Sequence, residues 1–204
     1  MVLNIIGIGL GDEKDITLKG LELVKKSSFV YLESYTSRLN CDIVALEKLY
    51  GKKIILADRD MVENGTEIVS NAKDKEVSFL VIGDVFGATT HVDIMERAKE
   101  SGIKVNIVHN SSILTAVGET GLELYKFGKT TSIPFGNKDI KSPIKVLEDN
   151  QKIGLHTLFL LDLDPLNDKF MTVNEAIEYL FRNKVKDQLG IVCCGLGSSK
   201  QIIK

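Results

Sequence analysis

The sequence predicts an α/β fold with mainly parallel sheets, on two observations. Short apolar, β-branched runs recur along the chain with helical patterns between them, as is typical of strands covered on both faces. In addition, a glycine- or hydroxyl-rich loop follows three of these runs directly. Because a parallel sheet gathers the loops after its strands along one edge, we expect these three loops to converge on one ligand.

Seven apolar runs are predicted to be strands from their β-branched composition and length. They are Val2–Ile6, Phe29–Leu32, Lys53–Ala57, Val77–Ile82, Lys104–Val108, Leu155–Leu161 and Leu189–Cys194. A further strand-like segment, Thr130–Pro134, follows a stretch punctuated by glycines. We therefore expect a domain boundary there, with an N-terminal domain over residues 1–118 and a C-terminal domain over residues 119–204.

Three helices are predicted, two of them from capping signals at their starts. The first begins after Asp15 or Thr17, either of which can cap it, and ends in two lysines, which a helix C-terminus favours. A second is expected over His91–Glu100. The capping-box pattern Thr172-Val173-Asn174-Glu175 opens a third helix over Ala176–Arg182.

Bulk composition excludes several classes of protein. A chain of 204 residues with 44% hydrophobic and 26% charged residues is ordinary for a globular protein. A net charge of -2 gives no electrostatic reason to expect nucleic-acid or membrane binding. Met1 leads directly into a strand pattern, and no apolar run approaches the ~20 residues that a membrane span needs. We expect a cytoplasmic protein.

Residues that commonly bind metals are few: Cys41, Cys193, Cys194, His91, His109 and His156. Their spacing matches no zinc motif, so we expect no metal site. Reduced, buried thiols are the favoured interpretation of the cysteines. His109 ends a strand beside one of the three loops and could lie near a ligand, whereas His156 is expected to be structural.

The first loop, Gly7–Asp12, has glycines at positions 7, 9 and 11. Its third glycine comes one residue too early for the dinucleotide-binding fingerprint. A nicotinamide-dinucleotide site and a tight turn that touches no ligand both remain open from the residues alone.

The second loop, Gly83–Thr90, places Asp84 at the end of a strongly apolar strand. This carboxylate could accept hydrogen bonds from the hydroxyl or amine groups of a ligand. Alternatively, it could cap a helix that begins near Thr89 or Thr90.

The third loop, Asn110–Ser112, precedes a short helical pattern. The backbone N–H groups at that helix start suit a polar ligand group. Plain N-capping by Ser111 or Ser112 is the alternative.

Several longer segments of the sequence resemble a known family. They are Ile6–Leu21, Tyr31–Ser37, Gly83-Asp84, Ala88–His91, Ser112–Gly118, Thr120–Thr130, Gly154–Leu158 and Met171–Ala176. Across these stretches the chain resembles the diphthine synthases, which belong to the tetrapyrrole-methylase-like S-adenosylmethionine-dependent methyltransferases.

The resemblance implies an enzyme with two α/β domains, each with a mainly parallel sheet, and S-adenosylmethionine bound in the cleft between them. It implies a homodimer. The implied substrate is a protein, translation elongation factor 2, whose modified histidine is methylated in diphthamide biosynthesis. Members methylate an amine repeatedly, and eukaryotic members also form a carboxylate methyl ester. The stretch Ser132–Phe135 favours the ester-forming type.

The resemblance also implies which residues contact S-adenosylmethionine. They are Leu10, Asp84, Gly87, Ser112, Ile113, Leu161 and Cys194. Gly87 stands where the family has a larger apolar residue, so a contact there must use the backbone. The general base stays unknown: Asp84 and His109 are both candidates.

The chain departs from the family in length. The family continues after the position of Lys204, where it includes a histidine that contacts the cofactor. Residues 135–143 form a shorter segment without the family's tryptophan, and residues 164–168 are also fewer than in eukaryotic relatives. We expect the intact protein to exceed 22.5 kDa.

Three other functions stay open at this point. A tetrapyrrole C-methyltransferase would share the architecture. An oxidoreductase of the Rossmann type would bind a nicotinamide, although the glycine spacing disfavours it. A non-catalytic binding protein is the third alternative.

Overall fold

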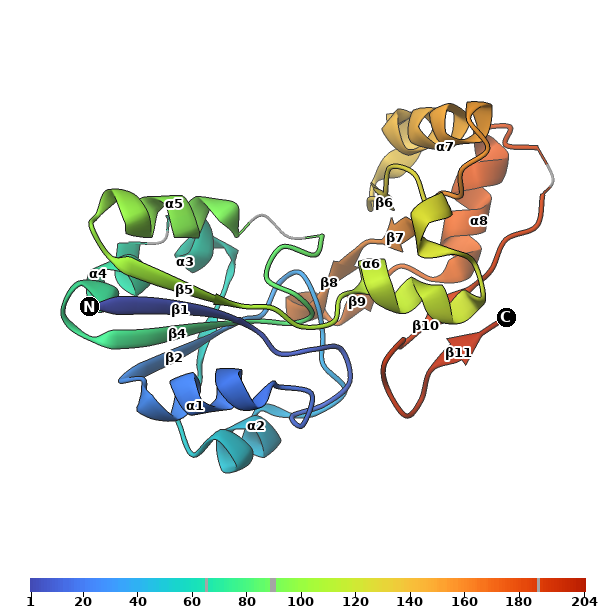
Figure 1. The fold of residues 1–204 in the computed structure, drawn as a ribbon. Coiled ribbons are helices and arrows are strands. Elements are labelled where there is room, and N and C mark those ends of the chain that lie inside the picture. Colours follow the sequence, from blue (N-terminus) through green and yellow to red (C-terminus); the bar gives the residue numbers. More distant parts are fainter. Residues whose placement is uncertain (65, 89–90, 187) are drawn as a thin grey trace. The chain divides into compact units, whose positions relative to one another are not determined.

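The computed structural model describes residues 1–64, 66–88, 91–186 and 188–204. The chain forms two compact units, Met1–Ala116 with Gly195–Gln201, and Val117–Cys194 with Ile202–Lys204 (Figure 1). The sequence-based boundary at residue 118 is close to this division. However, it assigns Gly195–Gln201 to the C-terminal domain, whereas these residues cluster with the first unit. The division into domains stays a prediction.

The first unit is built on a five-stranded sheet in the order β3-β2-β4-β1-β5. All four neighbouring pairs are parallel, as the apolar runs predict. The strands are β1 (Val2–Gly7), β2 (Phe29–Glu33), β3 (Ile55–Ala57), β4 (Glu76–Val81) and β5 (Lys104–Val108). Because they are parallel, all of their carboxyl ends lie at one edge.

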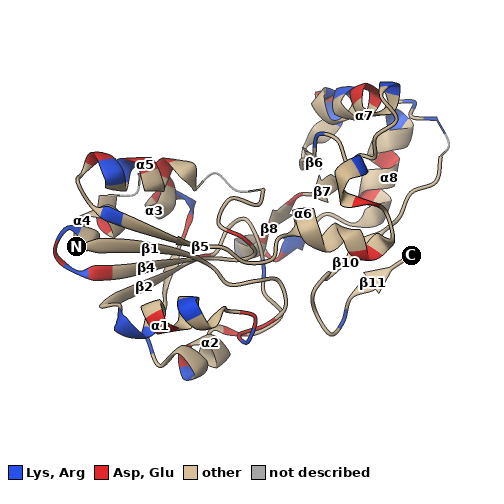
Figure 2. Cartoon of the chain, in the orientation of Figure 1, with Lys and Arg blue, Asp and Glu red and all other residues tan. Residues whose placement is uncertain are grey.

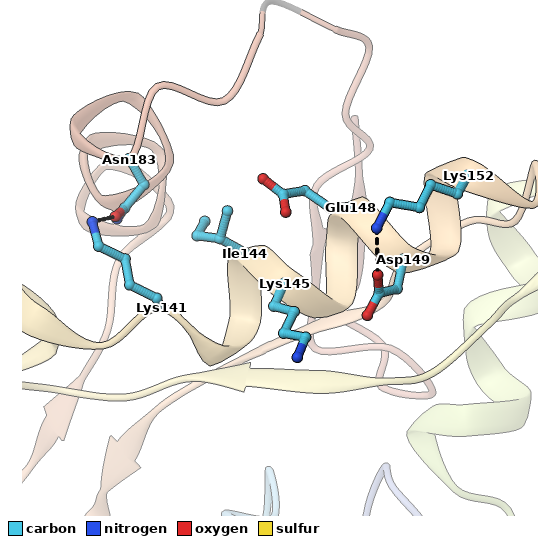
Figure 3. Close-up of a pocket in the computed structure, with 7 residues that line it drawn as sticks. All are labelled: Lys141, Ile144, Lys145, Glu148, Asp149, Lys152 and Asn183. Carbon is cyan, nitrogen blue, oxygen red and sulfur yellow. Dashed lines mark hydrogen bonds and ion pairs between the residues drawn. The ribbon is translucent and has the colours of Figure 1, made fainter.

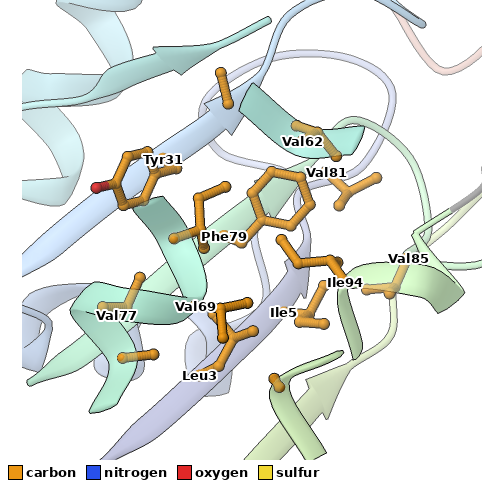
Figure 4. Close-up of a cluster of buried hydrophobic side chains, with 14 of the residues drawn as sticks. Leu3, Ile5, Tyr31, Val62, Val69, Val77, Phe79, Val81, Val85 and Ile94 are labelled. Carbon is orange, nitrogen blue, oxygen red and sulfur yellow. The ribbon is translucent and has the colours of Figure 1, made fainter. Parts of the chain in front are cut away.

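Helices cover both faces of this sheet (Figure 1). Helices α1 (Leu18–Lys26) and α2 (Ile43–Tyr50) pack on one face, where Ile6, Val24 and Tyr50 share a core. Helices α3 (Arg59–Asn64), α4 (Thr66–Asp74) and α5 (Val92–Glu100) lie on the other. Figure 4 shows the second core, in which Leu3 and Ile5 meet Phe79, Val69 and Ile94. Burial on both faces explains why the strands show no polar alternation.

The connections place a switch point between the central strand β4 and its neighbour β1. Strand β1 continues into α1 on one face, while its neighbour β4 continues into α5 on the opposite face. Beyond these loops the chain therefore turns toward opposite faces of the sheet, and open parallel sheets bind their ligands at the carboxyl edge where this happens.

In the described part of the second unit, three short strand pairs form. Strands β6 (Thr131–Ile133) and β7 (Phe159–Leu161) are parallel. The other pairs are antiparallel: β8 (Leu163–Asp164) with β9 (Lys169–Phe170), and β10 (Cys193–Cys194) with β11 (Ile202–Ile203). The single mainly parallel sheet that the resemblance implies for this half is thus reduced, among the described residues, to one parallel pair.

Two helices cover the pair β6–β7 and build the second unit's core. Helix α7 (Ser142–Lys152) contributes Ile144, and α8 (Val173–Arg182) contributes Tyr179. The predicted capping box is confirmed: Thr172 Oγ1 accepts from the Glu175 N–H, and Glu175 Oε2 accepts from the Thr172 N–H at 2.7 Å. The remaining short helices are α6 (Ile113–Ala116), η1 (Val117–Thr120), η2 (Leu124–Lys126), η3 (Asn137–Asp139) and η4 (Pro165–Asn167).

Several predicted strands are longer than the observed ones; β3, for example, begins at Ile55 and not at Lys53. In Leu155–Leu161, the first residues run beside residues 126–128, with the His156 N–H donating to the Lys126 carbonyl, but regular pairing starts only at Phe159. In Leu189–Cys194, pairing starts only at Val192, which exchanges two backbone hydrogen bonds with Lys204, and it continues through Cys193 and Cys194. In these two segments the apolar run predicts extended backbone, but it does not predict how many of its residues pair with another strand.

The surface chemistry agrees with a charge near zero. Figure 2 shows both signs interspersed on helices such as α5 and α7. In the described part of the chain, no helix has the length and apolarity needed to cross a membrane. The three cysteines are free, but Cys41 and Cys193 are only half-buried and Cys194 is exposed, so the prediction of buried thiols is wrong for Cys194 and met only in part by the other two.

Candidate functional site at the carboxyl edge of the first sheet

The first and second loops are joined backbone to backbone. The Gly83 N–H donates to the Gly9 carbonyl at 2.8 Å, and the Gly9 N–H donates to the Gly83 carbonyl at 3.2 Å. Both residues have positive φ, +81° at Gly9 and +86° at Gly83, which glycine adopts at little cost. The glycines thus serve a close crossing of two loops, and the prediction that these strand ends converge is confirmed.

The Asp15 carboxylate fixes the backbone of the first loop. Its Oδ2 accepts from the Gly11 N–H at 2.7 Å and from the Leu10 N–H at 3.2 Å. The helix cap is instead Thr17, whose Oγ1 accepts from the Gly20 N–H at 3.0 Å. Of the two capping candidates, Thr17 is therefore confirmed and Asp15 is not, because its carboxylate is committed to the loop.

Asn110 ties the third loop to the first. Its Nδ2 donates to the Gly7 carbonyl at 3.0 Å and to the Asp15 carbonyl at 2.9 Å. Its Oδ1 accepts from the Ser111 N–H at 2.7 Å. One side chain thus connects the ends of β1 and β5, a role that sequence reasoning missed although Asn110 follows directly after a predicted strand.

Asp84 braces the second loop against the third. Its Oδ1 accepts from the Phe86 N–H at 3.0 Å, while Oδ2 accepts from the Asn110 N–H at 2.9 Å. The same Oδ2 lies 2.9 Å from His109 Nδ1. Burial raises the pKa of Asp84, but these three hydrogen bonds favour the carboxylate more strongly, and the net pKa is lowered.

The hydrogen bonds of Asp84 can be compared with the alternative prediction that this residue caps the helix after the second loop. The helix start near Thr89 and Thr90 lies outside the described residues. Among the described ones, Asp84 caps its own turn through Phe86 and reaches across to the third loop. Contact between Asp84 and a ligand stays a prediction.

Gly87 and Ser112 pack against each other, which closes the second loop onto the third. A Cβ atom at Gly87 would lie 2.5 Å from the Ser112 Cβ, a distance that real side chains do not tolerate. This contact explains why glycine stands at position 87. Ser112 is buried, and its Oγ accepts from the Leu114 N–H at 3.1 Å, so it caps the turn that begins α6.

A segment from the far end of the sequence lies against the first loop. A Cβ atom at Gly197 would lie 3.0 Å from the Leu10 Cβ, and one at Gly11 would lie 2.6 Å from the Gly197 carbonyl oxygen. Gly197 has φ +81° and belongs to the first unit. Sequence reasoning missed this contact because nothing local to Gly197 points to a partner nearly two hundred residues earlier.

The structure thus gathers five of the seven predicted contact residues at one edge of the first unit: Leu10, Asp84, Gly87, Ser112 and Ile113. Leu161 ends β7 and Cys194 ends β10, both in the second unit. The approach of Leu161 and Cys194 to the same ligand stays a prediction.

Two hollows are lined by residues outside these loops. One, of about 390 Å³, runs along α7 (Figure 3) and is lined by Lys141, Ile144, Lys145, Glu148, Asp149, Lys152 and Asn183. Two of its charged side chains, Lys152 and Asp149, form an ion pair at 2.8 Å. The second, of about 240 Å³, borders the buried His91 in the first unit. In the described part of the chain, no cluster of three or more acidic, histidine or cysteine side chains could hold a metal ion.

Sequence comparison places the chain in a family. Residues 2–204 match the family described as Tetrapyrrole (Corrin/Porphyrin) Methylases. The chain belongs to this family. It is 47% identical to the diphthine methyl ester synthase of Dictyostelium discoideum, over 96% of this chain and 81% of that protein. It is 51% identical to the diphthine methyl ester synthase of Yarrowia lipolytica, over 100% of this chain and 77% of that protein.

Structural comparison agrees. A crystal structure of diphthine synthase superposes with a TM-score of 0.93 at 37% identity, covering 100% of this chain and 81% of that one.

Proposed function

We propose that the chain is an S-adenosylmethionine-dependent methyltransferase that acts as a diphthine methyl ester synthase. Its substrate is the modified histidine of translation elongation factor 2, on which it methylates the amine and then the carboxylate. The identity of about half of all residues to curated diphthine methyl ester synthases supports this. The observation that carries the proposal is the set of three loops fixed to one another at the sheet's carboxyl edge.

The residues at this edge fit a methyl donor of the S-adenosylmethionine type. Gly87 packs closely against Ser112, so it would contact a ligand through its backbone. Leu10 and Ile113 are half-exposed apolar side chains beside it. These residues would hold the donor, together with Leu161 and Cys194, and its sulfonium would supply the methyl group.

What the chain itself contributes is alignment. Transfer from a sulfonium is an in-line displacement, so its rate depends on how well donor and acceptor are oriented and how well water is excluded. Loops joined by backbone hydrogen bonds and by Asn110 supply a fixed frame for that purpose.

A homodimer, a cytoplasmic location and two domains meeting near residue 118 form part of this proposal, on the strength of the resemblance. Light scattering of the purified chain tests the dimer. Limited proteolysis near residue 118 tests the boundary, since it should release two stable fragments.

The activity test uses labelled S-adenosylmethionine and elongation factor 2 that carries the unmethylated histidine modification. We expect label in the elongation factor, with mass increments of successive methyl groups and one that alkali removes, as an ester requires. Elongation factor lacking the modification is the matched control and should take no label. Transfer to a precorrin-type macrocycle instead would refute the proposal in favour of tetrapyrrole methylation.

A further inference from the structure

His109 precedes the third loop directly, and its ring contacts Asp84. Nδ1 lies 2.9 Å from Asp84 Oδ2, and 67% of the side chain is exposed. An ionised carboxylate only accepts hydrogen bonds, so in the neutral ring Nδ1 carries the proton and Nε2 keeps a lone pair. A histidine oriented by a carboxylate, with its other nitrogen able to receive a proton, is the arrangement of a general base.

Asp84 is suited to orient this ring because it is itself held. Two backbone N–H groups, from Phe86 and Asn110, donate to its carboxylate. The Phe86 ring also lies beside the His109 ring, with centroids 6.0 Å apart. The carboxylate therefore stays ionised and fixed, and the imidazole is restrained on two sides.

The other histidines and the carboxylates Glu33 and Asp15 do not match this description. Glu33 is buried and its Oε1 accepts from two backbone N–H groups, while Asp15 holds the first loop. His91 is buried, and His156 packs on an aromatic ring in the second unit. Among the described residues, Asp84 is the charged side chain in contact with the His109 ring.

Resting on the proposed function, we propose that His109, oriented by Asp84, is the general base that deprotonates the acceptor amine before each amine methylation. The proton of the acceptor ammonium passes to Nε2, and the freed lone pair attacks the methyl carbon. The carbon–sulfur bond breaks, its electron pair stays on sulfur, and the imidazolium then returns its proton to solvent. An exposed ring suits this task because the acceptor belongs to another protein.

The two acceptors make the inference testable within one enzyme. The carboxylate acceptor carries no proton near neutral pH, so ester formation does not use a base, whereas the ammonium acceptor does. Two forms of elongation factor 2 separate these steps: one with the unmethylated amine, and one already fully methylated on nitrogen. The variant is His109→Gln in the full chain, and His156→Gln is the matched control.

We expect His109→Gln to slow amine methylation at pH 7 by about 10²- to 10⁴-fold, as is usual for loss of a general base. Ester formation should change by less than about twofold, and the amine defect should shrink toward pH 10 as the amine loses its proton unaided. Asp84 is a positioning residue, so Asp84→Asn should also slow amine methylation near pH 7, and this defect should also shrink toward pH 10. His156→Gln should retain both rates.

Three outcomes would overturn the inference. They are an unchanged amine rate in His109→Gln, an equal loss of both rates, and a ¹⁵N NMR spectrum of the free enzyme with the His109 proton on Nε2. The spectrum needs no substrate, so it tests the orientation independently of the activity. A wild-type chain that methylates neither form would instead refute the proposed function, and the base assignment would fall with it.

Discussion

The buried histidine His91 makes a pH-dependent contribution to stability that can be worked out from the structure. Its side chain is 1% exposed, and neither ring nitrogen has a hydrogen-bond partner among the described residues. It packs edge-on against Phe79, with ring centroids 5.2 Å apart. Burial without a partner penalises the charged ring and lowers the pKa of His91 from 6.5 to about 4.

The direction of the effect follows from linkage. Because the pKa of the folded state lies below that of the unfolded state, the unfolded chain binds the proton first as the pH falls. The contribution is therefore fully present above about pH 6.5 and is lost progressively down to about pH 4. A difference of this size corresponds to about 3 kcal/mol of unfolding free energy.

The measurement compares the wild type with His91→Leu, which does not titrate. Urea unfolding is followed by circular dichroism, since the chain has no tryptophan, at pH 7.5 and pH 4.5, on either side of the pI of about 6.0. Carboxylates common to both proteins cancel in the difference. We expect the stability of the wild type, relative to the variant, to fall by about 2–3 kcal/mol between the two pH values. A difference that stays constant with pH would refute the reasoning.

Three further predictions address the loops and the second unit. Gly87→Ala should weaken the binding of S-adenosylmethionine, measured by calorimetry, because the added methyl group meets Ser112. The control Gly190→Ala, which has open space around it, should keep the wild-type affinity, and equal affinities of the two variants would contradict the prediction. Asn110→Ala removes two hydrogen bonds that join the third loop to the first and one within the third loop. It should lower the unfolding free energy by about 2–3 kcal/mol, and a loss under about 0.5 kcal/mol would count against its bracing role. Thr172→Ala removes the hydroxyl of the capping box and should destabilise the second unit by about 1 kcal/mol in chemical denaturation. An unchanged unfolding free energy would contradict this prediction.

Elements with local signals could be predicted from the sequence. The parallel strands of the first unit follow from apolar runs whose burial leaves little choice of structure, and Thr17 and Thr172 cap helices as their positions indicate. The convergence of the loops follows from parallel topology alone, because strands that run the same way end at the same edge.

The partners of the loop residues could not be predicted. Asn110 reaches Gly7, which is 103 positions away, and Gly197 lies against Leu10 from the other end of the chain. No periodicity or cap signal encodes such a contact, which depends on how the finished sheet orders its strands. The same limit applies to Asp84: its place after a strand suggested a ligand or a cap, whereas its donors come from its own turn and from residues 25 and 26 positions later.

This bracing has a consequence for how the proposed site would work. Each tie between the loops is made within the protein: two glycine backbones, the Asn110 amide and the Asp84 carboxylate. A donor that enters such a frame does not have to order it, so less of its binding energy is lost to immobilising chain. The same ties leave Asp84 with three protein donors and little capacity for a further one, which shifts its main task from holding a ligand to fixing the third loop and the His109 ring. Loss of Asp84 would then affect orientation at the acceptor as much as affinity for the donor.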